Sequence, residues 1–218
     1  MLLVAENLRE SCDGKARVFR NDLVCLDLDG NLLWYRGLTH DYPNASNSLG
    51  MASSPVVIGD TVIVQVESQS DSFAMGLDVR DGTTRWHRKQ HRFDNWSSPI
   101  ELPGKDPAKS LVLLQNMVGL TALEARTGTE AWHYDEPSSR TPSSVVANGI
   151  VFIPSNGLTA LRPAADGKQA PEIAWKDNRF GSGTPSPLVY RGRVFTMSGP
   201  IVKCSDAANG KLIWQLRL

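Results

Sequence analysis

Short runs of β-branched and apolar residues, separated by tight turns, follow one another along most of this chain. The clearest set begins with Val56–Ile58 and Thr61–Val66, two runs that a Gly-Asp dipeptide separates. Such a connection is typical of a β-hairpin. The segment FAMGLDV then predicts a third strand, Arg80–Thr83 a turn, and TTRWHRK a fourth strand. We therefore expect a four-stranded antiparallel sheet within residues 51–90.

This pattern recurs, and each copy ends in a small residue, an acidic residue in most copies, a glycine turn and a tryptophan. The five copies are CLDLDGNLLW at 25–34, GLDVRDGTTRW at 76–86, ALEARTGTEAW at 122–132, ALRPAADGKQAPEIAW at 160–175 and CSDAANGKLIW at 204–214. Five of the six tryptophans therefore share one repeat position, at intervals of 52, 46, 43 and 39 residues. Self-similarity at such a period is typical of propellers and solenoids, and four strands in about 38 residues match one propeller blade.

The repeat predicts an all-β fold, a β-propeller of four-stranded antiparallel blades in a single domain over residues 1–218. We expect about four complete blades and one partial blade, at approximately 1–38 (partial), 51–90, 97–136, 141–179 and 184–218. The first copy is incomplete because no Ser-Pro pair precedes its strands. Since the sequence starts near the middle of a repeat, we expect the chain to be a piece of a larger propeller.

The recurring residues have separate physical roles in such a blade. A tryptophan fills the wedge between adjacent sheets, and its indole N–H needs an acceptor, which a carbonyl of the next blade can supply. Glycine suits the turn because it adopts positive φ at little cost, and a short acidic side chain can accept backbone N–H bonds there. The residues are Trp34, Trp86, Trp132, Trp175 and Trp214; Asp27, Asp78, Glu124 and Asp206; and Gly30, Gly82, Gly128, Gly167 and Gly210. Arg162 replaces the acid in the fourth copy, where the turn is also longer.

Composition narrows the classes of partner. The 23 basic and 23 acidic side chains give a formal net charge of zero, which disfavours nucleic acid and anionic membrane as partners. We expect no membrane span, because no run of about 18 apolar residues exists. The N-terminal MLLVAENLRESCDGK has no features of a signal peptide, so the chain is either cytoplasmic or cut from a longer exported protein, and the repeat favours the second.

Cysteine and histidine offer little chemistry. Cys25 and Cys204 occupy the small-residue position of the repeat and are expected to be buried filler, whereas Cys12 lies beside a predicted turn. His87 and His91 lie four residues apart on a strand, which places them about 13 Å from each other and disfavours a zinc pair. We expect no catalytic residue and no metal ligand among these side chains.

The motif small-[LS]-[DE]-x(2–3)-G-x(3)-W, preceded by Ser-Pro-apolar hairpins, resembles the repeat of PQQ-like (pyrroloquinoline quinone-like) β-propellers. The resemblance covers Leu23 to Leu218. It implies that the repeated tryptophans and small residues form an inter-blade docking motif, and it favours a periplasmic or secreted location. Family members usually close with eight blades, so the chain either lacks about three blades or closes with fewer.

The family contains quinoprotein dehydrogenases, which hold the quinone and a calcium ion, and non-enzymatic propellers such as the outer-membrane assembly lipoproteins. This sequence departs from the dehydrogenases because its three cysteines are far apart, and no carboxylate pair with an asparagine stands out as a calcium site. We therefore expect a non-catalytic scaffold of the second type without a cofactor. The alternative is a fragment of a PQQ- and calcium-dependent dehydrogenase that oxidises an alcohol or a sugar.

The loops that join one blade to the next are the candidate binding surface, because propeller function usually lies on loops that a rigid frame supports. We expect one face to carry Asp41, Tyr42, Arg92, Asn95, Trp96, Arg140 and Arg179. Trp96 is the only tryptophan outside the repeat position, and an aromatic residue with arginines nearby is typical of a recognition anchor. The alternative is that Trp96 covers the blade entrance. The expected partner is a protein or a small-molecule ligand, or else the missing blades of a parent chain.

Overall fold

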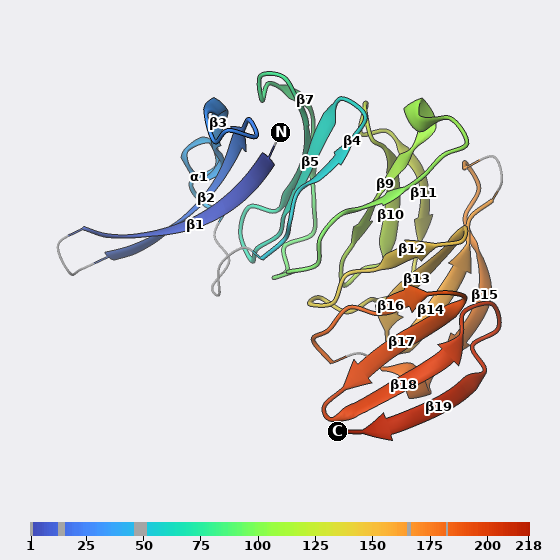
Figure 1. Ribbon diagram of the computed structural model, residues 1–218. Helices are drawn as coiled ribbons and strands as arrows, with labels where there is room; N and C mark the ends of the chain where they lie inside the picture. Colours follow the sequence, from blue (N-terminus) through green and yellow to red (C-terminus); the bar gives the residue numbers. More distant parts are fainter. Residues whose placement is uncertain (1, 13–15, 46–51, 165–166, 182) are drawn as a thin grey trace. The chain divides into compact units, whose positions relative to one another are not determined.

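The computed structural model describes residues 2–12, 16–45, 52–164, 167–181 and 183–218 (Figure 1). Its strands form five antiparallel sheets, and within each sheet the strands follow sequence order. The first sheet has three strands and each of the other four has four strands. The prediction of an all-β propeller with four complete blades and one partial blade is confirmed.

The strand bounds show how closely each sheet follows the repeat. The first sheet contains β1 (Leu2–Cys12), β2 (Ala16–Leu26) and β3 (Leu32–Gly37). The second contains β4 (Val56–Ile58), β5 (Thr61–Val66), β6 (Phe73–Asp78) and β7 (Thr84–Lys89). The third contains β8 (Ile100–Leu102), β9 (Leu111–Gln115), β10 (Leu120–Glu124) and β11 (Glu130–Tyr134).

The last two sheets repeat this arrangement. The fourth contains β12 (Val145–Ala147), β13 (Ile150–Ser155), β14 (Gly157–Arg162) and β15 (Glu172–Asp177). The fifth contains β16 (Leu188–Tyr190), β17 (Arg193–Ser198), β18 (Ile201–Asp206) and β19 (Leu212–Arg217). The helical segments are short: α1 (Leu38–Asp41), η1 (Pro107–Lys109) and η2 (Asn178–Phe180). Within the described ranges no helix is long and apolar enough to cross a membrane.

The register explains why a small residue precedes each acid. The small residue lies directly opposite the repeat tryptophan on the neighbouring strand, as Gly76 lies opposite Trp86 and Ala160 opposite Trp175. A Cβ built on Gly76 would lie 2.2 Å from Trp86 Nε1, so a small residue makes room for the indole. A β-bulge follows the small residue in all five sheets and re-aims the strand into the glycine turn.

The chain separates into two compact units. Unit 1 comprises residues 1–95 and 125–128, and unit 2 comprises residues 96–124 and 129–218. This division does not test the single domain over residues 1–218, which stays a prediction.

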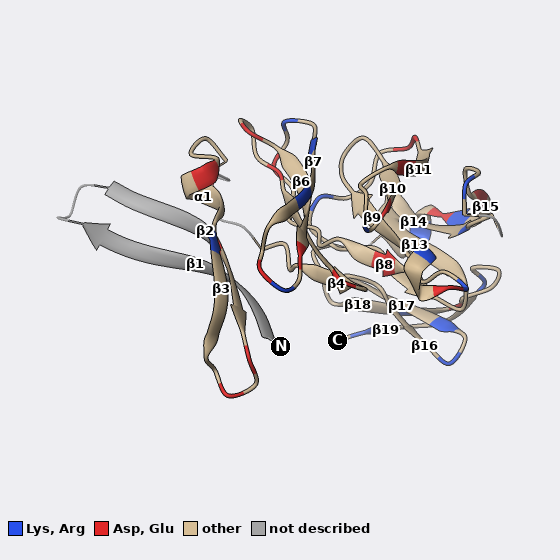
Figure 2. Cartoon of the chain, turned by 90° about the horizontal axis from the view of Figure 1, so that it is seen from above, with Lys and Arg blue, Asp and Glu red and all other residues tan. Residues whose placement is uncertain are grey.

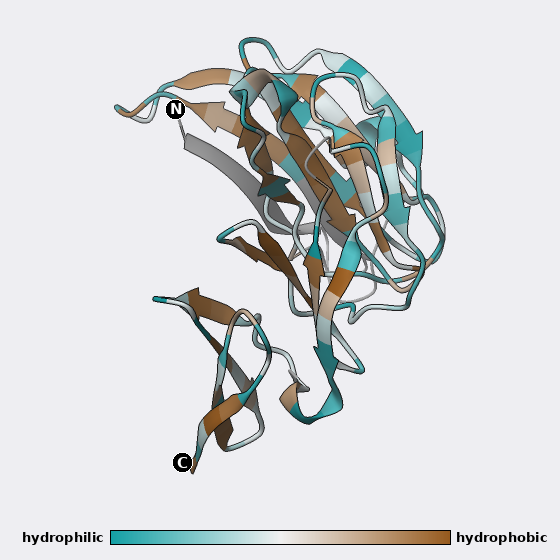
Figure 3. Cartoon of the chain, turned by 90° about the vertical axis from the view of Figure 1, so that its right-hand side faces the viewer, coloured by the Kyte–Doolittle hydropathy of each residue, from teal (hydrophilic) through white to brown (hydrophobic). Residues whose placement is uncertain are grey.

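The core of each unit comes from the middle strands of its sheets. Every residue of β5 and β6 is buried in unit 1, and the third and fourth sheets bury Leu113, Leu120 and Phe152 in unit 2. Figure 3 shows the hydrophobic residues concentrated on strands and hydrophilic residues in many of the connecting turns. Basic and acidic residues are interspersed along the described strands and turns (Figure 2). Within each unit the sheets therefore form an apolar core that supports polar loops.

Candidate functional site at the loop end of unit 2

One end of the third and fourth sheets gathers the loops that the sequence singled out. In a four-stranded antiparallel sheet, the start of the first strand, the connection between the second and third, and the end of the fourth lie at the same end. In unit 2 this end carries residues 96–99, 116–119 and 135–144, which we call the loop end.

Gln115, the last residue of β9, fixes the largest of these loops. Its side chain is buried, and Nε2 donates to the carbonyl oxygens of Ser139 at 2.5 Å and Pro142 at 2.9 Å. Its Oε1 accepts a hydrogen bond from Ser144 Oγ at 2.5 Å. One buried amide thus holds three points of the loop after β11, which restricts the backbone that carries Arg140.

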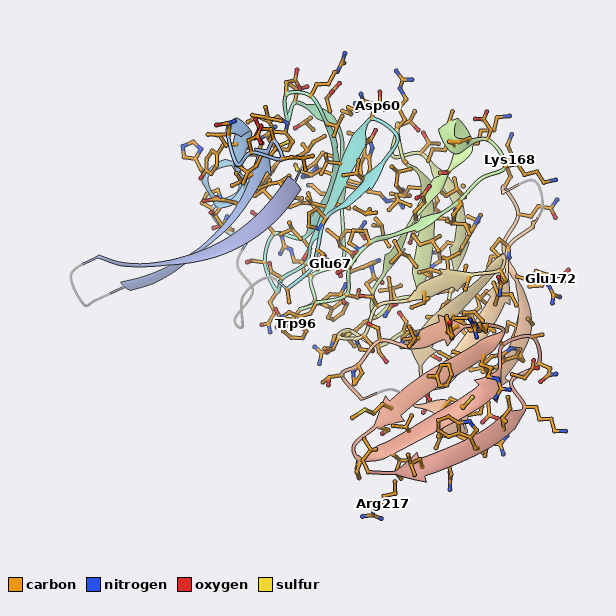
Figure 4. The ribbon with its side chains drawn as sticks, in the orientation of Figure 1. Asp60, Glu67, Trp96, Lys168, Glu172 and Arg217 are labelled. Carbon is orange, nitrogen blue, oxygen red and sulfur yellow. The ribbon has the colours of Figure 1, made fainter. Side chains whose placement is uncertain are left out.

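Trp96 and Arg140 are brought together on this support. The backbone N–H groups of Trp96 and Ser97 both donate to the Arg140 carbonyl oxygen, at 2.8 Å and 3.0 Å. The Arg140 guanidinium lies 5.8 Å from the centre of the Trp96 ring, which is a cation–π arrangement. Arg140 is exposed and Trp96 is half-buried, with its ring beyond the strands at the end of the sheet (Figure 4).

Equivalent serines connect the three sheets of unit 2 at the same end. The backbone N–H of Ser98 donates to Ser143 Oγ at 2.9 Å, and the N–H of Ser143 donates to Ser186 Oγ at 2.9 Å. Each of these serines lies two residues before the first strand of its sheet. This serine ladder joins the loop end from sheet to sheet. A proline follows Ser98 and Ser186, so two of its three members belong to the Ser-Pro pairs of the repeat.

Four of the predicted surface residues lie in unit 1, and they differ in accessibility. Asp41 pairs with Arg36 at 2.8 Å. The ring of Tyr42 lies 4.4 Å from Phe73 and stacks on His87 at 5.1 Å, so it is part of the local packing. Two further predicted residues lie after β7: Arg92 is exposed, whereas Asn95 is 4% exposed and contributes almost no accessible surface.

Arg179 is exposed in unit 2, but local contacts engage it. Its Nη2 lies 2.6 Å from Asp177 Oδ2, and its guanidinium lies 5.9 Å from the Phe180 ring centre. The hydrogen bonds from Arg179 lower the pKa of Asp177. Arg179 belongs to the loop after β15, whereas Trp96 and Arg140 belong to the loops after β7 and β11.

Three of the repeat tryptophans make the same contact with the following sheet. The indole N–H donates to the carbonyl oxygen of the residue directly after the acid position. The pairs are Trp34 with Val79 at 3.0 Å and Trp86 with Ala125 at 2.9 Å in unit 1, and Trp175 with Ala207 at 2.9 Å in unit 2. Each ring lies against the turn glycine, because a Cβ on Gly82, Gly128 or Gly210 would approach it to 2.7, 2.6 or 2.7 Å.

The remaining two repeat tryptophans differ from this pattern. The Trp132 indole nitrogen is buried and has no hydrogen-bond partner among the described residues. In the fourth copy, where Arg162 replaces the acid, a Cβ on Gly167 would meet Leu111 at 3.9 Å and no tryptophan ring. Trp214 is 40% exposed, and its ring lies 6.1 Å from Phe195 of the same sheet.

The acidic side chains of the repeat accept hydrogen bonds mainly from groups of their own turns. Asp27 accepts the backbone N–H groups of Asp29 and Asn31, and Asp206 accepts that of Ala208. Asp78 accepts the N–H of Arg80 and also binds its guanidinium. Glu124 is exposed. Gly30 has φ +86°, as the turn requires.

Reactive and metal-binding groups are sparse. Cys25 and Cys204 are free and fully buried, and the Cys12 side chain lies outside the described residues. Across the described part of the chain, no group of three or more His, Cys, Asp or Glu side chains could hold a metal ion.

A sequence profile of the family described as outer membrane protein assembly factor BamB matches residues 108–218. No curated protein sequence gives a match.

Among solved structures, BamB from Moraxella catarrhalis is similar, with a TM-score of 0.63 and 19% identity over 91% of this chain and 56% of that chain. Quinohemoprotein alcohol dehydrogenase from Comamonas testosteroni is similar with a TM-score of 0.58 and 17% identity, over 80% of this chain and 36% of that chain. Quinohemoprotein alcohol dehydrogenase ADHIIG from Pseudomonas putida HK5 is similar with a TM-score of 0.57 and 15% identity, over 80% of this chain and 35% of that chain. This chain thus spans about half of the BamB structure and about a third of the two dehydrogenases, and at these identities the likeness shows the fold alone.

Proposed function

Because this chain belongs to the outer membrane protein assembly factor BamB family, we propose that it is a non-catalytic scaffold that binds a protein partner. The binding surface is the loop end of unit 2, with Trp96 and Arg140 at its centre. The observation that carries this proposal is the Trp96–Arg140 pair, in which an exposed guanidinium lies over an aromatic ring. Hydrogen bonds from the backbone N–H groups of Trp96 and Ser97 to the Arg140 carbonyl oxygen hold the two segments together.

The physical support is preorganisation. Tryptophan and arginine are enriched among the few residues that dominate the binding energy of protein interfaces. Ordering a mobile loop at binding costs free energy, and the buried Gln115 amide and the serine ladder have already restricted this backbone. The loop end can therefore present Trp96 and Arg140 with little ordering cost.

The chemistry of the pair also indicates the kind of segment it would accept. The Trp96 ring offers an apolar face, and Arg140 offers several N–H donors that match a carboxylate. We propose a partner segment with an apolar side chain next to an acidic one.

A fragment of a quinoprotein dehydrogenase is the second candidate, because this chain shares the propeller fold of that class. The two quinohemoprotein dehydrogenases share the propeller fold at 15% and 17% identity. Calcium takes six to eight oxygen ligands, which can come from carboxylates, carbonyl groups and water, so the test below includes PQQ together with calcium. We assign no step of a reaction to any residue.

The test uses the full chain immobilised on a resin, with detergent-solubilised outer membranes of the source organism as the sample. Retained outer-membrane proteins are identified by mass spectrometry, and the affinity for the strongest of them is then measured with purified components. We expect Trp96→Ala to weaken that affinity by about 2 kcal/mol or more, which is roughly 30-fold, and Arg140→Ala to weaken it as well.

Ile173→Ala is the matched control, because Ile173 is 48% exposed and lies near the start of β15, at the opposite end of the fourth sheet from the loop end. Equal retention by wild type and Trp96→Ala would contradict the proposal. Saturable quenching of tryptophan fluorescence by PQQ with calcium, together with alcohol-dependent dye reduction, would favour the dehydrogenase instead.

A further inference from the structure

A tight turn of the third sheet brings one more apolar side chain to the loop end. Residues 116–119 connect β9 with β10, and Met117, a central residue of this turn, is 38% exposed. Asn116 and Gly119 exchange backbone hydrogen bonds at 3.0 and 3.2 Å, which close the turn. Asn116 Oδ1 also accepts the N–H groups of Val118 and Gly119 at 2.9 and 3.2 Å. Hydrogen bonds on both sides therefore restrain the backbone that carries Met117.

This turn is hydrogen-bonded to both of the loops that form the Trp96–Arg140 pair. Ser97, which follows Trp96 in the sequence, donates from its Oγ to the carbonyl oxygen of the last residue of β9 at 3.0 Å. Ser138, two residues before Arg140, donates from its Oγ to the Asn116 carbonyl oxygen at 2.6 Å. All of these residues belong to unit 2, so three separate loops share one hydrogen-bonded support within it.

The residue types on these three loops suit a contact surface. Tryptophan, arginine and methionine are enriched at protein interfaces relative to the rest of the protein surface. A methionine side chain is flexible and polarizable, so it adapts to apolar groups of different shape. Because the turn fixes its backbone, Met117 adds a second apolar contact beside the Trp96 ring and the Arg140 guanidinium.

We propose that Met117 is a third contact residue of the loop end, and that oxidation of its thioether to the sulfoxide weakens binding of the partner. This role of Met117 rests on the scaffold function proposed above. The partner segment has an acidic side chain between two apolar ones. The acid pairs with Arg140, one apolar side chain packs on Trp96, and the other packs on Met117.

The oxidation needs only a hydroperoxide such as hydrogen peroxide. One oxygen atom passes to the Met117 sulfur, so a sulfur–oxygen bond forms and the oxygen–oxygen bond breaks. The thioether is oxidised by two electrons, and the peroxide is reduced to water. A sulfoxide is polar, and its formation disrupts apolar contacts at interfaces that contain methionine. Met75 is 0% exposed in β6, so this methionine is shielded from the oxidant.

The first test uses a synthetic peptide, Gly-Ser-Leu-Asp-Leu-Ser-Gly with both ends blocked, and the full chain isotope-labelled at its methionine methyl groups. The signal that disappears from the NMR spectrum of Met117→Leu is assigned to Met117. We expect this signal to shift saturably as the peptide is added, and the Met75 signal to stay in place. The same peptide with Asn in place of Asp should bind more weakly, because it lacks the charge that pairs with Arg140.

Affinities of the variants are measured by fluorescence anisotropy of the peptide carrying fluorescein. Met117→Gln should weaken binding about 10-fold, because a polar amide replaces the apolar contact. Met117→Leu keeps an apolar side chain of similar volume and should bind like wild type. Peroxide treatment should weaken binding by wild type about 10-fold and leave binding by Met117→Leu unchanged, and mass spectrometry of peptides locates the sulfoxide.

Met197→Leu is the matched control, because Met197 is also 38% exposed and lies in β17, outside the loop end. It should lose affinity on oxidation as wild type does. A Met117 signal that does not shift, equal affinity of Met117→Gln and wild type, or an equal loss of affinity by oxidised Met117→Leu would overturn the role of Met117. Retention of an outer-membrane protein that depends on Trp96 would in those cases leave the scaffold function standing. Circular dichroism confirms that each variant is folded.

Discussion

A single indole N–H distinguishes two tryptophans of unit 2 that are otherwise comparably buried. Trp175 is 9% exposed and donates to the Ala207 carbonyl oxygen, whereas Trp132 is 4% exposed and its N–H has no partner among the described residues. Replacing either by phenylalanine removes the same volume. Trp175→Phe breaks a buried hydrogen bond, whereas Trp132→Phe removes a donor that has no partner among the described residues.

We therefore expect Trp175→Phe to lower the free energy of unfolding by about 1–2 kcal/mol more than Trp132→Phe does. Urea denaturation of the two variants and wild type, followed by circular dichroism, measures this difference. Equal losses would mean that the Trp175 hydrogen bond makes no net contribution.

Two glycines separate the cost of backbone strain from the cost of a steric clash. Gly149 and Gly210 have nearly equal φ, +72° and +73°. A Cβ on Gly149 meets nothing within 4 Å, whereas one on Gly210 lies 2.7 Å from the Trp175 ring. Gly149→Ala should cost about 1–2 kcal/mol for left-handed backbone, and Gly210→Ala about 1–3 kcal/mol more for the displaced ring. Thermal unfolding of both variants checks this, and similar losses would contradict it.

The sequence identifies these residues better than it identifies their partners. The position of each tryptophan and glycine follows from the repeat, because the side-chain volume and the positive φ are local requirements. That Trp132 has no acceptor among the described residues was indicated only indirectly, by Arg162 in the acid position and the longer turn. The role of Gln115 gave no sequence signal, because its partners lie 24 to 29 residues away in an irregular loop.

The turn after β6 is held by ion pairs that make the second sheet sensitive to pH. Arg85 bonds both Asp60 and Asp78 at 2.6–2.8 Å, and Arg80 bonds Asp78 at 2.8 Å. The hydrogen bonds from Arg80, with those from Arg85, hold the pKa of Asp78 far below its ordinary value. The folded state therefore favours the charged carboxylate.

The lowered pKa of Asp78 determines how the stability of the protein depends on pH. A carboxyl with a lowered folded pKa contributes stability above its unfolded pKa of about 3.9, and that contribution is lost as the pH falls below this value. Asp78→Asn should be less stable than wild type at pH 7, and the gap should narrow as the pH falls from 5 to 3. Urea titrations at several pH values measure it. Asp29→Asn, at an exposed carboxylate, should change little, and a gap for Asp78→Asn that is independent of pH would contradict the argument.

Strands were easier to predict from the sequence than loops. The bounds of β4 and β5 coincide with the two β-branched runs on either side of the Gly-Asp turn, where Gly59 has φ +60°. The loop residues could be assigned to one end of the sheets by topology, but not to contacts with one another. Trp96 meets Arg140 through hydrogen bonds between two irregular segments, and Asn95 is buried although its neighbour Arg92 is exposed. Such contacts depend on the packing of whole loops.

For the molecule as a whole, the repeat predicted the number and type of sheets because each sheet is specified within about 40 residues. In unit 2, successive sheets are connected by shared hydrophobic packing, by the hydrogen bond of one docking tryptophan and by the serine ladder. In repeat proteins the stability is approximately a sum of the stabilities of single repeats and of their nearest-neighbour interfaces. A substitution that weakens one interface should then destabilise only the sheets on either side of it.

Trp175→Ala tests this at the interface of the fourth and fifth sheets. Hydrogen exchange read by mass spectrometry should show faster exchange in β12–β19, because the cavity and the lost hydrogen bond weaken both sheets. Peptides from β4–β7 should exchange as in wild type, since no contact of Trp175 reaches unit 1 among the interactions described for it. Gly149→Ala, a turn defect within one sheet, is the control for a change that does not affect an interface. Faster exchange throughout the chain would show that the sheets unfold as one cooperative body, and the nearest-neighbour description would then fail.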